Sequence, residues 1–308
     1  MISKTFEINE ENINNRLDIF LANQFDNLSR GIVQKLIQSH SVSVSGNFVE
    51  KDYKLKLGDT IDVEINLSSQ TEDEPQNIPL EVLFDNKDFL IINKQAGLTV
   101  HPGAGQKDNT LTNGLLFHFP DLKSIPRTGL IHRLDKDTSG LMLIAKTLKA
   151  HTALTDMIQK RSISRKYLAL VHGKPISGDT IDKPIGRHPT NRLIFTVKEN
   201  GRDSITHYLV KERYKNFSLL EVSLETGRTH QIRVHLKHAG FPIAGDRAYC
   251  SITKWKDSNE DEVHAIESLN RQALHAYNLA FTLDGEEFNF HSDIPADIEK
   301  CINSLQKR

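Results

Sequence analysis

The stretch HRLDKDTSGLMLIA, residues 132–145, joins a polar loop directly to an apolar run. Its first nine residues include an arginine, two carboxylates, two hydroxyls and a glycine, whereas LMLIA (141–145) has no polar side chain. A short run that is apolar on both faces predicts a buried strand. Because functional groups are commonly carried on loops that a rigid sheet holds in place, we expect the polar loop to lie at the end of a buried sheet and to form a site.

Strands outnumber helices over residues 78–308. The clearest helix covers residues 148–160, with apolar residues on one stripe. Alternating or apolar runs predict strands in LEVLFD, DFLIINK, LMLIAK, YLALVHG, ITHYLVKE, FSLLEVSLE and HQIRVHL. Since strands and helices do not alternate regularly, this pattern favours an α+β domain over a dinucleotide-binding parallel sheet.

A smaller pattern precedes this domain. NRLDIFLANQF (15–25) has apolar residues at helical spacing, and Ser29 is a suitable N-cap for a second helix through Ile37. The alternating runs VSVSGNFV and KLKLGDTIDVEI follow and predict strands with turns at Gly46-Asn47 and Gly58-Asp59. Two helices followed by a small sheet resemble the S4 domain, an RNA-binding module. A purely structural module of the same shape is the alternative.

Three segments follow from these patterns. Residues 67–77 are rich in polar residues and contain a proline, which is typical of a linker. We therefore expect an S4-like RNA-binding domain over residues 1–66, a linker over 67–77 and a larger α+β domain over 78–308.

Charge is distributed unevenly along the chain. Residues 123–254 contain 24 Lys and Arg against 11 Asp and Glu, whereas the rest of the chain contains 15 against 29, so the net charge of −1 hides a basic region. Such asymmetry indicates that one region meets phosphates, unless the basic residues are scattered around the surface. Residues 1–66 contain 7 basic and 10 acidic residues, so RNA binding by this segment would depend on Arg30, Lys35, Lys54 and Lys56.

Several classes of protein are disfavoured. The sequence has no apolar run long enough for a membrane span, and its N-terminus does not resemble a signal peptide. Cys250 and Cys301 form no CxxC pattern, which favours a cytoplasmic protein without disulfides. HPGAGQKDN (101–109) and GKPISGDT (173–180) lack the residues of a dinucleotide or phosphate loop, so we expect no cofactor. We also expect no metal, since His230 and His235 would point to opposite faces of a strand.

The polar loop has a second element to work with. If residues 130–134 are extended, Arg133 and Asp135 point to the same side. The segment TGRTHQIRVH (226–235), interpreted as a strand, would place its polar residues on one face and line a cleft with them. A carboxylate there could be kept ionised by an arginine, because a nearby guanidinium lowers a carboxyl pKa that burial would raise. A surface ion pair is the plainer interpretation.

HRLDKDTSG is similar to the catalytic loop of the RluA family of pseudouridine synthases. The resemblance continues in order through RKYLALV (165–171) and ETGRTHQIRVHLKHAGFPIAGDRAY (225–249), which are similar to the family's tyrosine and arginine motifs. HPGAG (101–105), PIGRHPTNR (184–192) and RQALHA (271–276) resemble its D-type subgroup, which acts on large-subunit rRNA and also carries an S4 domain. The resemblance implies a mixed, mainly antiparallel sheet in the catalytic domain.

The resemblance also implies roles for single residues. Asp135 would be the nucleophile, Tyr167 would pack against the target base, and Arg233 would form an ion pair with Asp135. Arg133 would help displace the target uridine and hold the RNA. We expect further RNA contacts from His132, Arg187 and Arg228.

We therefore expect a monomeric enzyme that isomerises uridines in 23S rRNA, most specifically in helix 69, either in naked rRNA or in a large-subunit assembly intermediate. Another large-subunit site, as in C-type enzymes, is the alternative within the class. A non-catalytic ribosome-assembly factor that uses the S4 module is an alternative of another class. A carboxylate-dependent hydrolase would need a second opposed acid, for which Asp137 is the candidate, although we expect Asp137 to face the turn.

Overall fold

The computed structural model describes residues 2–25, 30–65, 73–103, 106–191, 193–250 and 260–305. The chain divides into two compact units, Met1–Gln70 and Thr71–Arg308, and each has a hydrophobic core of its own. Residues 67–72 of the expected linker, 67–77, lie outside the described residues. The assignment of the first unit as an S4 domain stays a prediction.

The first unit packs two helices against a small antiparallel sheet with the order β1-β3-β2, and it also contains a short 3₁₀ turn. Its elements are β1 (Ile2–Glu7), η1 (Glu10–Asn12), α1 (Leu17–Gln24), α2 (Arg30–Gln38), β2 (Val42–Val44) and β3 (Thr60–Ile65). The helical spacing of apolar residues buries Leu17 and Leu21 against the sheet. Both expected helices are present, but the proposed N-cap Ser29 lies outside the described residues. Strand β1 was not expected, and the KLKL run forms only an isolated bridge at Lys54.

The second unit is built on a nine-stranded sheet with the order β4-β5-β6-β13-β7-β12-β11-β8, in which β14 pairs with β13. Only the pair β13 and β6 is parallel, so the expected mixed, mainly antiparallel sheet is confirmed. The strands of this unit are β4 (Glu81–Asp85), β5 (Phe89–Lys94), β6 (Ser139–Ala145), β7 (Ser164–His172), β8 (Asp179–Asp182), β9 (Ile185–Arg187), β10 (Phe195–Val197), β11 (Ile205–Arg213), β12 (Phe217–Leu224), β13 (Leu274–Leu283) and β14 (Glu286–His291).

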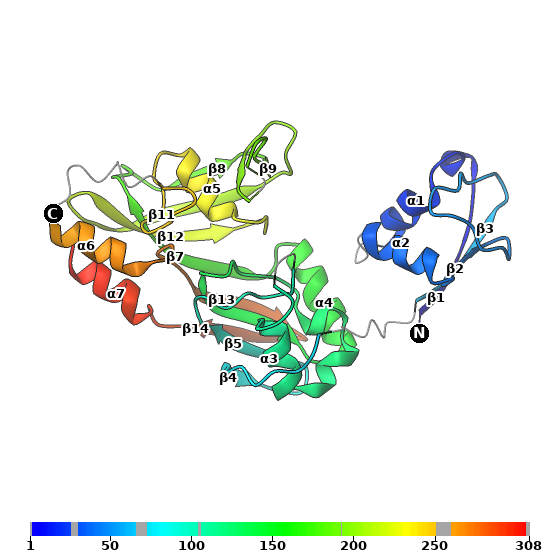
Figure 1. The fold of residues 1–308 in the computed structure, drawn as a ribbon, viewed down its shortest axis with the longest axis horizontal. Coiled ribbons are helices and arrows are strands. Elements are labelled where there is room, and N and C mark those ends of the chain that lie inside the picture. The colour runs from blue at the N-terminus through cyan, green and yellow to red at the C-terminus, as the bar shows by residue number, and fades with distance from the viewer. Residues whose placement is uncertain are drawn as a thin grey trace. The chain divides into compact units, whose positions relative to one another are not determined.

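Helices lie along this sheet at several places (Figure 1). They are α3 (Leu111–His118), η2 (Pro120–Ser124), η3 (Pro126–Gly129), α4 (Leu148–Gln159), α5 (Gln231–His238), α6 (Glu260–Leu269) and α7 (Ala296–Asn303). Helix α4 packs on β6, α5 packs on β10 and β11, and α6 packs beside α7. Every residue of β6 is buried, as the apolar run LMLIA predicts.

The expected strand in HQIRVHL is wrong, because this segment forms helix α5. Polar and apolar residues alternate in it, but all residues from Gln231 to Leu236 are buried, so the alternation does not separate an exposed from a buried face. The polar side chains bond inside the fold instead: Gln231 donates to the Ile205 carbonyl, and His235 bonds the Thr206 hydroxyl. The basic last turn and the following Gly240, with φ +88°, are typical of a helix end.

Candidate active site

Asp135 lies on the loop that connects η3 to β6. Its side chain is only 16% exposed, and its Oδ2 accepts a hydrogen bond from Arg233 Nη1 at 3.1 Å. Oδ1 accepts no hydrogen bond from any residue that the structure describes. One carboxylate oxygen is therefore held by the protein, and the other is left for a substrate.

Arg233 is fixed by a second carboxylate. Its Nε and Nη2 donate to the two oxygens of Asp246 at 2.7 and 2.9 Å, and its guanidinium carbon lies 4.8 Å from the centre of the Tyr249 ring. Burial lowers the pKa of Arg233, but its hydrogen bond to Asp246 and the charges of Asp246 and Asp135 outweigh that effect and raise the pKa above its ordinary value. The arginine is therefore a permanent cation held between two acids, with its third nitrogen directed at Asp135.

The loop that carries Asp135 is tied to the sheet on both sides of the acid. His132 is buried, and its Nε2 accepts a hydrogen bond from the Leu143 backbone nitrogen at 3.0 Å. Burial, followed by the charges of Arg165 and Arg127, lowers the pKa of His132 to about 3, so the ring is neutral near pH 7. This geometry gives His132 a structural role in the loop, and its expected contact with RNA stays a prediction.

Lys94, at the end of β5, supports the other side of the loop. Its Nζ is buried and donates to the carbonyls of Gln95, Leu98 and Lys136, each at 2.9 Å. Burial lowers the pKa of Lys94 to about 7, against the attraction of Asp137 and Asp135. The Lys136 carbonyl is one residue from Asp135, so this lysine fixes the loop next to the acid.

Gly140 explains the end of the DTSG motif. Its φ is +117°, and a Cβ atom at this position would lie 2.2 Å from the Ala276 carbonyl oxygen of β13. Only glycine allows the loop to enter β6 so close to its parallel neighbour. Thr138 and Ser139 bond the Gln272 and His275 side chains and so hold this turn.

His230 also faces the acid. It is the N-cap of α5 with φ +57°, and its Nε2 lies 4.0 Å from Asp135 Oδ2 while its Nδ1 bonds the Tyr249 hydroxyl at 2.8 Å. Burial lowers the pKa of His230, partly opposed by the charge of Asp135. A left-handed backbone conformation costs free energy for a non-glycine residue, so the rest of the fold must stabilise His230 in its position beside Asp135.

Tyr167 lies on β7 and is 5% exposed. Burial raises the pKa of its hydroxyl; the charge of Arg165 opposes this shift and that of Asp135 adds to it. The tyrosine is therefore a neutral aromatic near the carboxylate.

Basic side chains border the same loop. Arg133 is exposed, and Arg127 donates to His101 Nε2 at 3.0 Å. Burial, together with the charges of Arg127 and Arg133, lowers the pKa of His101 to about 4, so this histidine is a neutral acceptor. Arg127 and Arg133 are therefore two cations that lie close to His101.

The other residues expected to contact RNA lie apart from Asp135 along the chain. Arg187 is exposed on β9 with its guanidinium carbon 5.3 Å from the centre of the Phe195 ring, and Arg228 is exposed and donates to the Asp203 carbonyl. In the first unit Arg30 bonds Asp18, and Lys54 and Lys56 are exposed. Lys35 belongs to α2, but its side chain lies outside the described residues.

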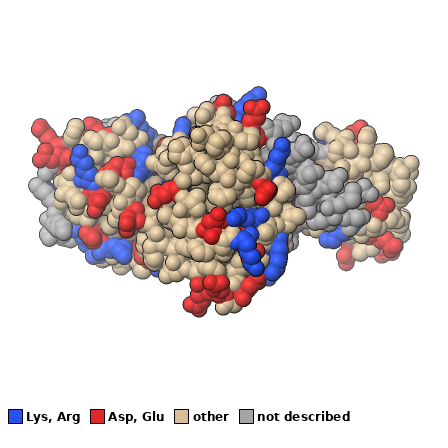
Figure 2. Space-filling model, turned by 90° about the horizontal axis from the view of Figure 1, so that it is seen from below, with Lys and Arg blue, Asp and Glu red and all other residues tan. Residues whose placement is uncertain are grey.

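Charged residues do not gather in one place on the face shown in Figure 2. Lys and Arg side chains are interspersed with Asp and Glu there, over the residues that the structure describes. The excess of basic residues over 123–254 therefore does not form a single uniform surface in this view.

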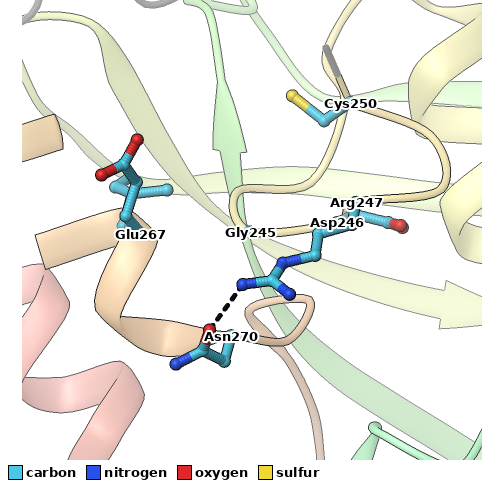
Figure 3. A pocket seen from close by; sticks show the side chains of 7 residues that line it. Gly245, Asp246, Arg247, Cys250, Glu267 and Asn270 are labelled. Carbon is cyan, nitrogen blue, oxygen red and sulfur yellow. Dashed lines mark hydrogen bonds between the residues drawn. The ribbon is translucent and has the colours of Figure 1, made fainter. Parts of the chain in front are cut away.

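A pocket of about 280 Å³ lies on the Asp246 segment but does not include Asp135. Figure 3 shows its lining residues, among which Arg247 donates to Asn270 Oδ1. Within the described parts of the chain, no group of three His, Cys, Asp or Glu side chains is arranged to hold a metal ion. None of the described helices is both long and apolar enough to cross a membrane.

Sequence reasoning placed Asp135 and Arg233 in one site but missed Asp246, His230 and Lys94. Asp246 lies within the quoted AGDRAY segment, but its pairing with Arg233 depends on a buried contact that the sequence does not show. No feature of the sequence pointed to Lys94, because a lysine at the end of an apolar strand usually reaches solvent.

The chain is similar to proteins of one kind. A family model described as RNA pseudouridylate synthase matches residues 88–238. The protein is 43% identical to the ribosomal large subunit pseudouridine synthase D of Xanthomonas campestris pv. campestris, over 95% of this chain and 89% of that protein. It is 38% identical to the protein of the same name from Escherichia coli K12, over 99% of this chain and 95% of that protein.

Solved structures agree with the fold. The structure of human RNA pseudouridylate synthase domain containing 1 matches with a TM-score of 0.58 and 26% identity, over 76% of this chain and 90% of that one. Together with the nearly full-length relatives, this shows that the chain belongs to the RluA family of RNA pseudouridine synthases.

Proposed function

We propose that this enzyme isomerises uridines to pseudouridine in 23S rRNA, in the stem-loop of helix 69, with Asp135 as its nucleophile. The proposal rests most directly on one observation: Asp135 is largely buried and receives a hydrogen bond from Arg233, whose other nitrogens are held by Asp246. Relatives about 40% identical over nearly the whole chain carry the name ribosomal large subunit pseudouridine synthase D, which supports the rRNA substrate. We further propose that it acts as a monomer in the cytoplasm.

The chemistry makes few demands beyond this site. Isomerisation breaks the C–N glycosidic bond, turns the detached base and forms a C–C bond to the same sugar, so no group is imported and no net redox change occurs. The target base must first leave its stack, which costs a few kcal/mol. Phosphate contacts by Arg133 and its basic neighbours offset that cost, while the Tyr167 ring receives the base.

Asp135 is suited to the covalent step. One of its oxygens is held by Arg233, so the carboxylate attacks the target nucleotide with the other oxygen while the guanidinium balances its charge. Arg233 is positioned in advance by Asp246, so little reorganisation accompanies the reaction.

Mapping pseudouridines on rRNA tests this proposal. We expect 23S rRNA from cells that lack the gene to lose pseudouridine in the helix 69 stem-loop, and the wild-type gene but not the Asp135→Asn gene to restore it. Loss at another large-subunit position would instead favour the C-type alternative. If the pseudouridines of the 23S rRNA were unchanged in cells that lack the gene, only the alternative of a non-catalytic assembly factor would remain.

A further inference from the structure

Three arginines in the described residues are more than nine-tenths buried, and one of them differs from the other two. Arg233 holds Asp246 and Asp135, and Arg271 holds Asp297 with two nitrogens at 2.6 and 2.8 Å. Arg165, on β7, is 7% exposed, but its guanidinium forms no ion pair with any described residue. Its Nε is buried and has no hydrogen-bond partner among the described residues.

Arg165 lies at the proposed active site. It precedes Tyr167 by two residues on the same strand, so both side chains point to the same face of the sheet. The two side chains are close enough for the charge of Arg165 to oppose the burial effect that raises the pKa of the Tyr167 hydroxyl. The Nη1 atom of Arg165 is 3.3 Å from the place where a Cβ atom of Gly227 would be, on the loop that leads into α5. The guanidinium therefore lies against bare backbone near the tyrosine.

A second unpaired donor lies close to it. Since His132 Nε2 accepts a hydrogen bond from Leu143, the neutral ring carries its proton on Nδ1. That Nδ1 is buried and also lacks a partner in the part of the chain that the structure describes, and the charge of Arg165 contributes to the low pKa of His132. Two buried donors in this region thus have no acceptor among the described residues.

An unpaired buried cation is costly, because its desolvation is not offset by an acid. Such a group is understandable when a ligand supplies the missing charge. A phosphate is the best match in an RNA substrate, since it is ionised before any bond breaks and a guanidinium can bind two of its oxygens at once. A uracil ring, by contrast, is neutral when it enters the site.

We propose that Arg165 binds a phosphate group that flanks the target uridine, beside the base that packs on Tyr167. This inference rests on the proposed function and adds to it a contact with a buried arginine, separate from the exposed cations Arg133 and Arg127. Binding of the phosphate there links base extrusion to recognition of the backbone, because the phosphate reaches the buried Arg165 only when its nucleotide enters the active site.

The test uses the full-length protein and a stem-loop RNA that the wild-type enzyme isomerises. Two further RNAs carry a single uncharged methylphosphonate, 5′ or 3′ of the target uridine. Arg165→Met removes the charge at similar length, and Arg165→Lys keeps the charge without the planar fork. Lys166→Met is the matched control, because Lys166 is the next residue on β7, is 39% exposed and pairs with Glu221.

We expect Arg165→Met to weaken binding of the unmodified RNA about 10- to 150-fold, the range for a hydrogen bond to a charged group. The slope of log affinity against log salt should become shallower by about 0.7–0.9, which corresponds to one phosphate contact. One of the two methylphosphonate RNAs should bind the wild-type protein as weakly as the unmodified RNA binds Arg165→Met. The same methylphosphonate RNA should bind Arg165→Met no more weakly than the unmodified RNA does. Arg165→Lys should keep the salt slope but bind more weakly than wild type, and Lys166→Met should match wild type.

Thermal unfolding separates this role from a structural one. Replacing an unpaired buried charge by an apolar side chain is often neutral or stabilising, so Arg165→Met should unfold at or above the wild-type temperature. A large fall in that temperature would overturn the proposal. So would wild-type RNA affinity in Arg165→Met, or methylphosphonate losses of equal size in both proteins. In each of these cases the wild-type enzyme still forms pseudouridine, so failure of this inference is distinct from failure of the proposed function.

Discussion

Asp246→Asn tests how far the site depends on a residue that contacts Asp135 only through Arg233. The Asp246 side chain is fully buried and accepts from Nε and Nη2 of Arg233, as well as from the backbone nitrogen of Ala248. Asparagine keeps one acceptor oxygen but places an NH₂ donor against the guanidinium. Since removal of one partner of a buried ion pair costs about 3–5 kcal/mol, we expect the second unit to lose about 3 kcal/mol and to melt roughly 6–12 °C lower.

The effect on the reaction follows from the same geometry. Without its second acid, Arg233 no longer has a fixed direction toward Asp135. The turnover number should fall by up to the value of that charge-assisted hydrogen bond, about 1.5–3 kcal/mol or roughly 10- to 150-fold. The KM for RNA should change little, because Asp246 is buried. Single-turnover and steady-state assays on a stem-loop RNA, below the melting temperature of the variant, measure both values.

Asp18→Asn is the matched control. Asp18 is a fully buried carboxylate in the first unit that holds Arg16 and Arg30. It should destabilise that unit and leave the single-turnover rate at saturating RNA unchanged. A wild-type turnover number in Asp246→Asn, or an equal loss of rate in both variants, would refute the argument that Asp246 positions Arg233 for catalysis.

Three further predictions concern other parts of the molecule. Tyr167→Leu should slow isomerisation about 5- to 150-fold more than Tyr167→Phe, because an aromatic face contributes about 1–3 kcal/mol per stacked base. Equal rates in single-turnover assays would exclude base packing on this ring. Burial raises the pKa of Asp18, but hydrogen bonds from Arg16, Gln34 and Arg30 outweigh this effect and lower the pKa well below its usual value. The stability that Asp18 contributes is therefore complete above about pH 4 and is lost as the pH falls further. The difference in unfolding free energy between wild type and Asp18→Asn should therefore shrink in acid, and a difference independent of pH would contradict this. Removal of residues 1–66 should weaken selection of rRNA, measured against competitor RNA, more than the single-turnover rate; a collapse of that rate at saturating RNA would instead make the first unit part of the active site.

Much of the fold was predictable because burial and hydrophobic pattern agree in most strands. β5 and β6 are apolar on nearly every residue and are buried, and the sequence predicted both. Helix α5 could not be recognised from its pattern, since its polar residues are buried in bonds to β11 and to Asp246 that only the folded chain brings together. The alternation of polar and apolar residues in this segment therefore reflects buried hydrogen bonds and not exposure to solvent on one face.

The candidate site was predictable to a similar degree. The pairing of Asp135 with Arg233 was expected from the resemblance, and the structure shows the two groups in contact across 98 residues of sequence. The residues that hold them, Lys94, His230 and Asp246, were not identified, because their roles depend on buried distances. His132 is buried and bonds Leu143, and its expected contact with RNA stays a prediction.

The amount of pseudouridine formed by Asp135→Asn on the substrate stem-loop, under single-turnover conditions, tests the nucleophile directly. Asparagine keeps the shape of the side chain and leaves Arg233 paired with Asp246, so the variant should fold and bind the RNA. We expect its rate to fall by about four orders of magnitude or more. A rate within tenfold of the wild-type value would show that the carboxylate held by Arg233 does not carry the reaction.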